Sequence, residues 1–249
     1  MSSIWEKMSL NDRIIACHVD ISNNAHFATL SGIVYVGDVK LDEDIVTAAT
    51  DGRNVIYAPS FIQDMTRKQL RFLVLHESLH KALHHCTTYK SLCEKYPSLC
   101  NKAMDYVVNG TIEETDPTHS FIEHPTTIPP LLDKKYFGWS FIQVLRDLLK
   151  NAKPIPKPQS GAGEGESSEG DDSLGHQSSS VGKIFVDPDG NPIGVQLDEH
   201  NMGELTEAEL KEADGQIEDA KHQGQILAQK LAGKGARGGN LDNIMAKRD

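Results

Sequence analysis

The chain has 249 residues, a net charge of −11 and 38% hydrophobic residues, enough for one large domain or for one domain with an appendage. An acidic chain lacks the basic footprint of a nucleic-acid-binding protein, so no nucleic-acid partner is expected. The chain contains no apolar run of 18 residues, and its first residues lack the apolar core of a secretion signal. We therefore expect neither a membrane span nor a membrane partner.

The four cysteines are Cys17, Cys86, Cys93 and Cys100, and none of them forms a close C-x-x-C pair. Without a secretion signal, this usage predicts a cytoplasmic protein with buried, reduced thiols. A structural metal site at the last three cysteines, beside His85, is the less favoured alternative.

The first part of the chain predicts a helix followed by a small sheet. Residues 3–22 carry apolar side chains at near-helical spacing, with Asn11 or Asp12 as a possible cap of the main part. Residues 25–60 are rich in β-branched and aromatic residues, which is typical of strands. Asp51-Gly52 between two apolar runs indicates a hairpin turn. An edge strand here could pair with an extended peptide, although simple support of the core explains these strands equally well.

The stretch 66–86 predicts a buried helix with a metal-binding face. It begins with Thr66 and Gln69, which match a capping box, and no Gly or Pro interrupts it up to Thr87. It contains His76-Glu77-Ser78-Leu79-His80, an H-E-x-x-H pattern. Histidines four residues apart on a helix share one face, so both imidazoles can bind one ion while the glutamate lies beside an open coordination position.

A third metal ligand is expected from the next long helix, predicted over residues 98–114. Asp105 lies in the middle of this otherwise apolar helix, where a carboxylate is costly unless it is paired or metal-bound. A catalytic zinc takes three protein ligands, and Asp105 could be the third. The alternative is a buried structural carboxylate. Asn101 and Asn109 continue the same polar stripe. We expect their amides to hydrogen-bond to metal ligands or to pack in the core, and not to bind the metal themselves.

Four further histidines could contribute to the site. His84 and His85 could stabilise a developing oxyanion or hold a ligand in place, and the alternative is that they simply favour the negative end of the helix dipole. His119 and His124 follow the second helix in a predicted loop and could contact a substrate.

The composition changes at residue 151 and divides the chain into three parts. Residues 1–150 form the expected metal-binding domain, which closes with a helix at Ser140–Lys150 capped by Ser140. Residues 151–182 are rich in Pro, Gly, Ser and Glu, which predicts a flexible acidic linker. Residues 183–249 form the C-terminal region.

The C-terminal region predicts two elements. A strand pair is expected about Asp189-Gly190. A polar helix is expected over Leu205–Leu231 with Thr206 as its cap. This helix has few large apolar residues and could dock on the metal-binding domain, cover its site or bind a partner protein.

Several of these motifs together resemble a known family, the putative metallopeptidase domain that precedes von Willebrand A-like domains in bacterial and phage proteins. The shared features are a T-D-G turn, an aromatic-x-P strand end, an H-E-x-x-H helix with a further histidine, and an N-x-A-x-D-x-x-x-N helix. Here they are Thr50-Asp51-Gly52, Tyr57 with Pro59, His76 to His80 with His85, and Asn101, Ala103, Asp105 and Asn109. The resemblance covers about residues 10–150, and the chain leaves no room for a von Willebrand A-like domain.

The resemblance implies an α+β, zincin-like fold, in which a small mixed β-sheet packs on the H-E-x-x-H helix and on a second ligand-bearing helix. It implies one Zn²⁺ ion on His76, His80 and Asp105, with Glu77 as the catalytic acid and base. The expected function is zinc-dependent hydrolysis of a peptide or protein substrate. The alternative is a catalytically inactive, zinc-stabilised protein-interaction module, and hydrolysis of a non-peptide amide is a third possibility.

Overall fold

The computed structural model describes residues 4–151, 153–154, 185–186, 205–233 and 241. The α-helices are α1 (Ile4–Lys7), α2 (Leu10–Asn23), α3 (Pro59–Ile62), α4 (Arg67–Ala82), α5 (His85–Thr88), α6 (Lys90–Lys95), α7 (Pro97–Thr115), α8 (Phe141–Asn151) and α9 (Glu207–Ala232). Short 3₁₀ helices are η1 (Ala28–Leu30), η2 (Ile33–Tyr35) and η3 (Lys134–Tyr136). The strands are β1 (Val39–Leu41), β2 (Ala48–Thr50), β3 (Val55–Tyr57), β4 (Lys153–Pro154) and β5 (Phe185–Val186). The described chain is mainly helical with a small mixed sheet, so the predicted α+β class is confirmed.

The N-terminal helix differs from its prediction because it breaks after its first turn. The break falls between α1 and α2, at Met8 and Ser9. Ser9, rather than Asn11 or Asp12, is the cap, because its hydroxyl accepts a hydrogen bond from the Asp12 N–H. Serine at this position satisfies one of the N–H groups that a helix start leaves without a partner.

The predicted sheet is shorter than expected, because residues 25–37 form 3₁₀ turns instead of strands. Apolar residues of η1 and η2 are buried without strand pairing. The β-branched residues of this segment therefore indicated a buried segment and not a strand. The sheet has the order β1-β3-β2, with β1 parallel to β3 and β2 antiparallel to it. The β2–β3 hairpin at Asp51-Gly52 is confirmed, with Gly52 at φ +95°. The Asp51 carboxylate accepts the N–H groups of Arg53 and Asn54.

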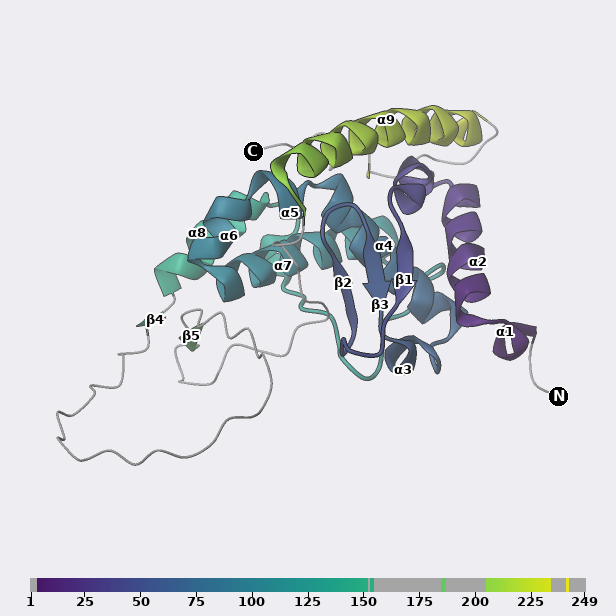
Figure 1. Cartoon of the computed structure of the whole chain (residues 1–249), viewed down its shortest axis with the longest axis horizontal. Helices are drawn as coiled ribbons and strands as arrows, with labels where there is room; N and C mark the ends of the chain where they lie inside the picture. The colour runs from purple at the N-terminus through teal and green to yellow at the C-terminus, as the bar shows by residue number, and fades with distance from the viewer. Residues whose placement is uncertain (1–3, 152, 155–184, 187–204, 234–240, 242–249) are drawn as a thin grey trace, which may run out of the picture.

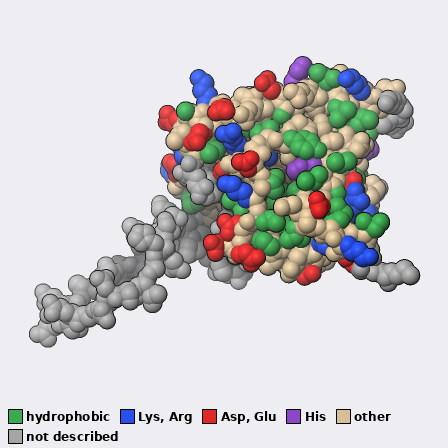
Figure 2. Space-filling view, turned by 45° about the vertical axis from the view of Figure 1, so that its right-hand side comes forward, with side chains coloured by type: hydrophobic (Ala, Val, Ile, Leu, Met, Phe, Trp, Pro, Cys, Tyr) green, Lys and Arg blue, Asp and Glu red, His purple; other side chains and the backbone are tan. Residues whose placement is uncertain are grey.

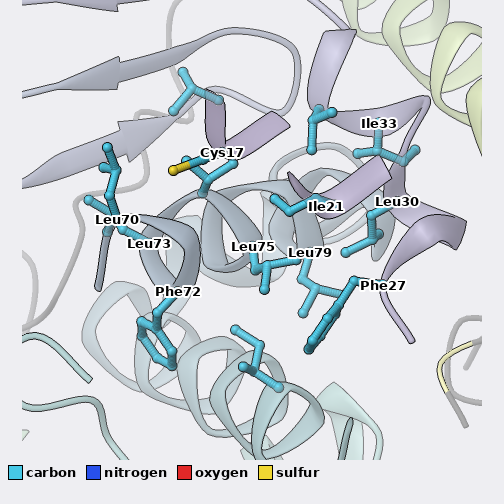
Figure 3. Close-up of a cluster of buried hydrophobic side chains, with 14 of the residues drawn as sticks. Cys17, Ile21, Phe27, Leu30, Ile33, Leu70, Phe72, Leu73, Leu75 and Leu79 are labelled. Atoms are coloured by element: carbon cyan, nitrogen blue, oxygen red, sulfur yellow. The ribbon is translucent and has the colours of Figure 1, made fainter. Parts of the chain in front are cut away.

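Helix α4 lies at the centre of the molecule and packs against α2, α7 and the sheet (Figure 1). Its start is the predicted capping box, in which Thr66 accepts from the Gln69 N–H and the Gln69 side chain accepts from the Thr66 N–H. Figure 3 shows how side chains from α2, the η1–η2 segment and α4 point into one apolar cluster. The labelled members are Cys17, Ile21, Phe27, Leu30, Ile33, Leu70, Phe72, Leu73, Leu75 and Leu79. This packing fixes the α4 backbone, and with it the rings that α4 carries.

Helices α7 and α8 form a second layer beside α4. Apolar residues of α7, such as Met104, pack against α8 residues such as Val144. The cap predicted at Ser140 is confirmed, since its N–H donates to the Gln143 side chain at 2.9 Å and its hydroxyl accepts from the Gln143 N–H. The packing of α7 against α4 is what brings their polar residues together.

The C-terminal helix α9 lies across one side of the domain, over η1 and the end of α4 (Figure 1). Its predicted cap at Thr206 is confirmed as part of a capping box with Glu209. Asp189-Gly190 and the second strand predicted after it lie outside the described residues, and the described part of the first strand, β5, pairs with β4. Almost all of the predicted linker 151–182 also lies outside the described part of the chain.

Two glycines allow α9 to approach the domain backbone closely. A Cβ on Gly224 of α9 would lie 2.0 Å from the carbonyl oxygen of Thr29, and a Cβ on Gly32 would lie 2.4 Å from that of Ala220. Neither position can accept a side chain without a shift of backbone. The helix is therefore docked on the part of the chain that carries α4, which is one of the roles that the sequence left open. On the face drawn in Figure 2, acidic and basic side chains are intermixed.

Candidate metal centre

Two neighbouring helices bring three potential metal ligands together in the core. His76 and His80 lie one turn apart on α4, and their Nε2 atoms are 3.2 Å apart. Oδ1 of Asp105, from the middle of α7, lies 3.9 Å from Nε2 of His76 and 3.6 Å from Nε2 of His80. All three side chains are 0% exposed. The structure thus groups the three residues that the sequence proposed as ligands.

The spacing of these atoms fits a tetrahedral ion. In a tetrahedral zinc site with bonds of about 2.0 Å, neighbouring ligand atoms are about 3.3 Å apart. The three distances of 3.2, 3.6 and 3.9 Å lie close to that value. Two imidazole nitrogens and one carboxylate oxygen are also a donor set that suits a divalent transition metal. His76, His80 and Asp105 could therefore hold a metal ion.

Asn109 fixes the orientation and the tautomer of His76. The Asn109 side-chain N–H donates to the carbonyl oxygen of Leu131 at 3.1 Å, so the amide oxygen faces His76. That oxygen lies 2.9 Å from Nδ1 of His76 and accepts its proton. The lone pair of the ring is then on Nε2, the atom that faces Asp105. Asn109, which the sequence placed beside the expected ligands, thus contacts one of them.

His85 plays the corresponding part for His80. Nδ1 of His85 lies 3.0 Å from Nδ1 of His80, and His85 is fully buried beside the ring of Phe141. When Nδ1 of His80 donates to His85, Nε2 of His80 keeps the lone pair that a metal requires. Both imidazoles thus present the same nitrogen to one point between α4 and α7.

Glu77 is completely buried on α4, next in the chain to His76. Burial raises the pKa of Tyr57 on β3 well above its ordinary value, and the negative charge of Glu77 adds to this effect. Burial lowers the pKa of Lys81 to about 8, while the charge of Glu77 partly opposes that change. Lys81 donates to the carbonyl oxygen of Val36 at 2.9 Å. The carboxylate of Glu77 is therefore held in a low-dielectric environment where its charge acts strongly.

His84 follows the end of α4 and is not part of the group formed by His76, His80 and Asp105. The helix stops at Ala82, although no Gly or Pro interrupts the sequence, and His84 takes the left-handed conformation at φ +56°. Its ring binds α9, with Nδ1 at 2.5 Å from Asp214 and Nε2 at 2.8 Å from Glu218. These contacts make His84 an anchor of α9. The spacing of His76, His80 and His84 placed His84 on the same helix face as the expected ligands. That prediction assumed a continuous helix, because no Gly or Pro marks the end of α4 in the sequence.

Asn101 is the remaining residue that the sequence singled out. It lies one turn before Asp105 on α7 and is only partly buried, unlike Asn109 one turn beyond. The main-chain carbonyl of Leu131 orients Asn109. Its role could not be predicted from the sequence, because every residue has a main-chain carbonyl and only the fold determines which one is near.

An H-E-x-x-H helix that meets a carboxylate from a second helix is an arrangement that metal-dependent hydrolases use. The chain belongs to the family described as "Putative metallopeptidase domain", whose model matches residues 12–247. The match extends well beyond residues 10–150, over which the sequence resembles the family, and includes α9. No curated protein and no solved structure matches the chain. Within the described residues, no helix is both long and apolar enough to cross a membrane.

Proposed function

We propose that the protein is a zinc metallopeptidase with a zincin-like fold, in which His76, His80 and Asp105 bind one Zn²⁺ ion. The observation that carries this proposal is the spacing of the three ligand atoms, 3.2 to 3.9 Å apart in the core. The hydrogen bonds behind both imidazoles support it, because they leave the two lone pairs aimed at one point. Zinc suits a set of two imidazoles and one carboxylate.

The remaining chemistry falls to the side chains around the ion. When bound, zinc supplies a Lewis acid that acidifies water and polarises a carbonyl group. The Glu77 carboxylate takes a proton from the water that attacks the peptide carbonyl carbon. It then delivers that proton to the leaving amine as the C–N bond breaks, which yields one carboxylate and one amine product. Asn109 and His85 keep the ligand rings in place throughout.

Burial of the whole cluster favours a second candidate function. His76, Glu77, His80 and Asp105 are each 0% exposed, so a peptide can reach them only after a covering segment moves. A closed site of this kind also suits a zinc ion that stabilises an interaction module without catalysis. The two functions use the same ligands and differ only in the role of Glu77.

Glu77→Gln separates these candidates because it removes the acid and base but keeps the shape of the side chain. Wild type and variant, each loaded with zinc, are incubated with a pool of peptides, and new termini are identified by mass spectrometry. A peptidase cleaves the pool as wild type, and the variant loses at least 100-fold in rate while it retains its zinc. Equal cleavage by both proteins rules out this role for Glu77. No cleavage by either zinc-loaded protein favours the interaction module.

A further inference from the structure

A second group of metal-type ligands lies at the far end of α7. Glu113 is on the last turns of α7, and His119 and His124 are on the segment that follows. The Glu113 carboxylate lies 2.9 Å from Nε2 of His119 and 2.6 Å from Nε2 of His124. The two imidazole rings are 4.7 Å apart between centroids. One carboxylate and two imidazole nitrogens therefore converge on one point.

The segment that carries the two histidines is held in shape by Asp116. Its carboxylate accepts hydrogen bonds from the N–H groups of Ser120, Phe121 and Ile122. Burial alone would raise the pKa of Asp116, but these hydrogen bonds and that of the Ser120 hydroxyl lower it below its ordinary value. The histidines are thus presented by a loop whose conformation is fixed near neutral pH.

Helix α4 holds the same loop from the other side. Lys68 donates to the carbonyl oxygen of His119 at 2.9 Å, and Gln69 donates to that of His124 at 3.3 Å. These bonds use main-chain oxygens, so both imidazoles remain available as ligands. The two rings meet Glu113 without competing with the contacts that position the loop.

We propose that Glu113, His119 and His124 form a second binding site for a divalent transition-metal ion such as Zn²⁺. Two histidines and one glutamate are a ligand set found on zinc, and three protein ligands leave room for water. The side chains are 17%, 38% and 27% exposed, respectively, so the ion is in direct exchange with solvent. An ion requires the Glu113–His124 contact to lengthen from 2.6 Å to about 3.3 Å, the separation of neighbouring ligand atoms in a tetrahedral zinc site.

The second site is separate from the buried one. Asp105 and Glu113 are eight residues apart on α7, which is a rise of about 12 Å and far more than the 3.5–4 Å of a two-metal catalytic centre. The ring of Phe72 lies between the sites, 6.3 Å from the ring of His76 and 5.1 Å from that of His124. The ion therefore links the loop to α7 and does not take part in chemistry at the first site.

Zinc binding to untagged full-length protein tests this proposal, with equilibrium dialysis and elemental analysis as the readout. The Asp105→Ala background removes a ligand of the buried site, so the remaining zinc reports on the second site alone. In that background we expect one exchangeable zinc per chain with affinity in the micromolar range. His124→Ala and Glu113→Gln should each weaken it at least tenfold, and His26→Ala, which removes an exposed histidine outside both groups, should leave it unchanged.

Two results overturn the proposal. One is an Asp105→Ala protein that binds no zinc in this range, and the other is zinc binding that His124→Ala and Glu113→Gln leave unchanged. Glu113→Gln keeps the size of the side chain, so it remains informative if His124→Ala fails to fold. Because neither variant touches the buried ligands, failure here is distinct from failure of the proposed peptidase function.

Discussion

The hydrogen bond from His76 to Asn109 allows a sharp prediction about metal affinity. Asn109→Ala removes the side-chain oxygen that lies 2.9 Å from Nδ1 of His76 and accepts its proton, without touching a proposed ligand. Loss of such a partner behind a ligating histidine weakens metal binding typically 10- to 100-fold, which is about 1.4–2.7 kcal/mol at room temperature. Competition with a chromophoric zinc chelator measures this change directly. We expect the dissociation constant of the buried site to rise by that factor.

Asn109→Asp is the matched control for this experiment. Its carboxylate can still accept the His76 proton, so zinc affinity should stay within about tenfold of wild type, although the bond to Leu131 is lost. The reasoning about the tautomer is refuted if Asn109→Ala binds zinc as tightly as wild type. It is also refuted if Ala and Asp weaken binding equally.

Three further predictions concern stability and thiol chemistry. Burial lowers the pKa of His18 to about 4, so unfolding takes up a proton between pH 6.5 and 4. The free energy of unfolding, measured by urea titration, should be full above pH 6.5 and fall by an amount on the order of 3 kcal/mol as the pH drops to about 4. It should fall less in His18→Gln. Burial raises the pKa of Cys17 to about 12 and all four cysteines are buried, so a thiol reagent should label none of them in minutes in the native protein and four after denaturation. Gly224→Ala, whose Cβ would lie 2.0 Å from Thr29, should lower stability by about 1–3 kcal/mol, whereas Gly215→Ala on the same helix meets nothing within 4 Å and should be neutral or slightly stabilising. A thermal melt in which the two glycine variants behave alike would argue against the close docking of α9.

Helices α4 and α7 were predictable because their signals are local. The capping box at Thr66, the i, i+4 spacing of His76 and His80, and the polar stripe through Asp105 each fall within a few residues of sequence. The same holds for the hairpin at Asp51-Gly52. Local sequence patterns do not predict that α7 packs on α4. A buried carboxylate and two buried imidazoles are nevertheless expected to lie together, because each is costly to bury without a polar partner or a metal ion.

Other features depend on contacts that the sequence does not mark. Residues 25–37 were predicted as strands, yet their β-branched residues are buried in 3₁₀ turns, where tertiary packing overrides propensity. His84 contacts α9 about 130 residues further along the chain, and no local pattern signals that pairing. Glu113 was missed although it continues the stripe of Asp105 and Asn109 at the same spacing. Extending that stripe by one turn would have placed it near the loop histidines.

Zinc content after purification tests most directly whether two histidines of α4 and one aspartate of α7 hold a metal ion, as we propose. Wild type and Asp105→Ala are dialysed against metal-free buffer, which removes ion from the exposed site, and zinc per chain is measured by mass spectrometry. We expect close to one zinc in wild type and a loss of most of it in Asp105→Ala. A zinc content that is near zero in wild type, or equal in both proteins, would contradict the account.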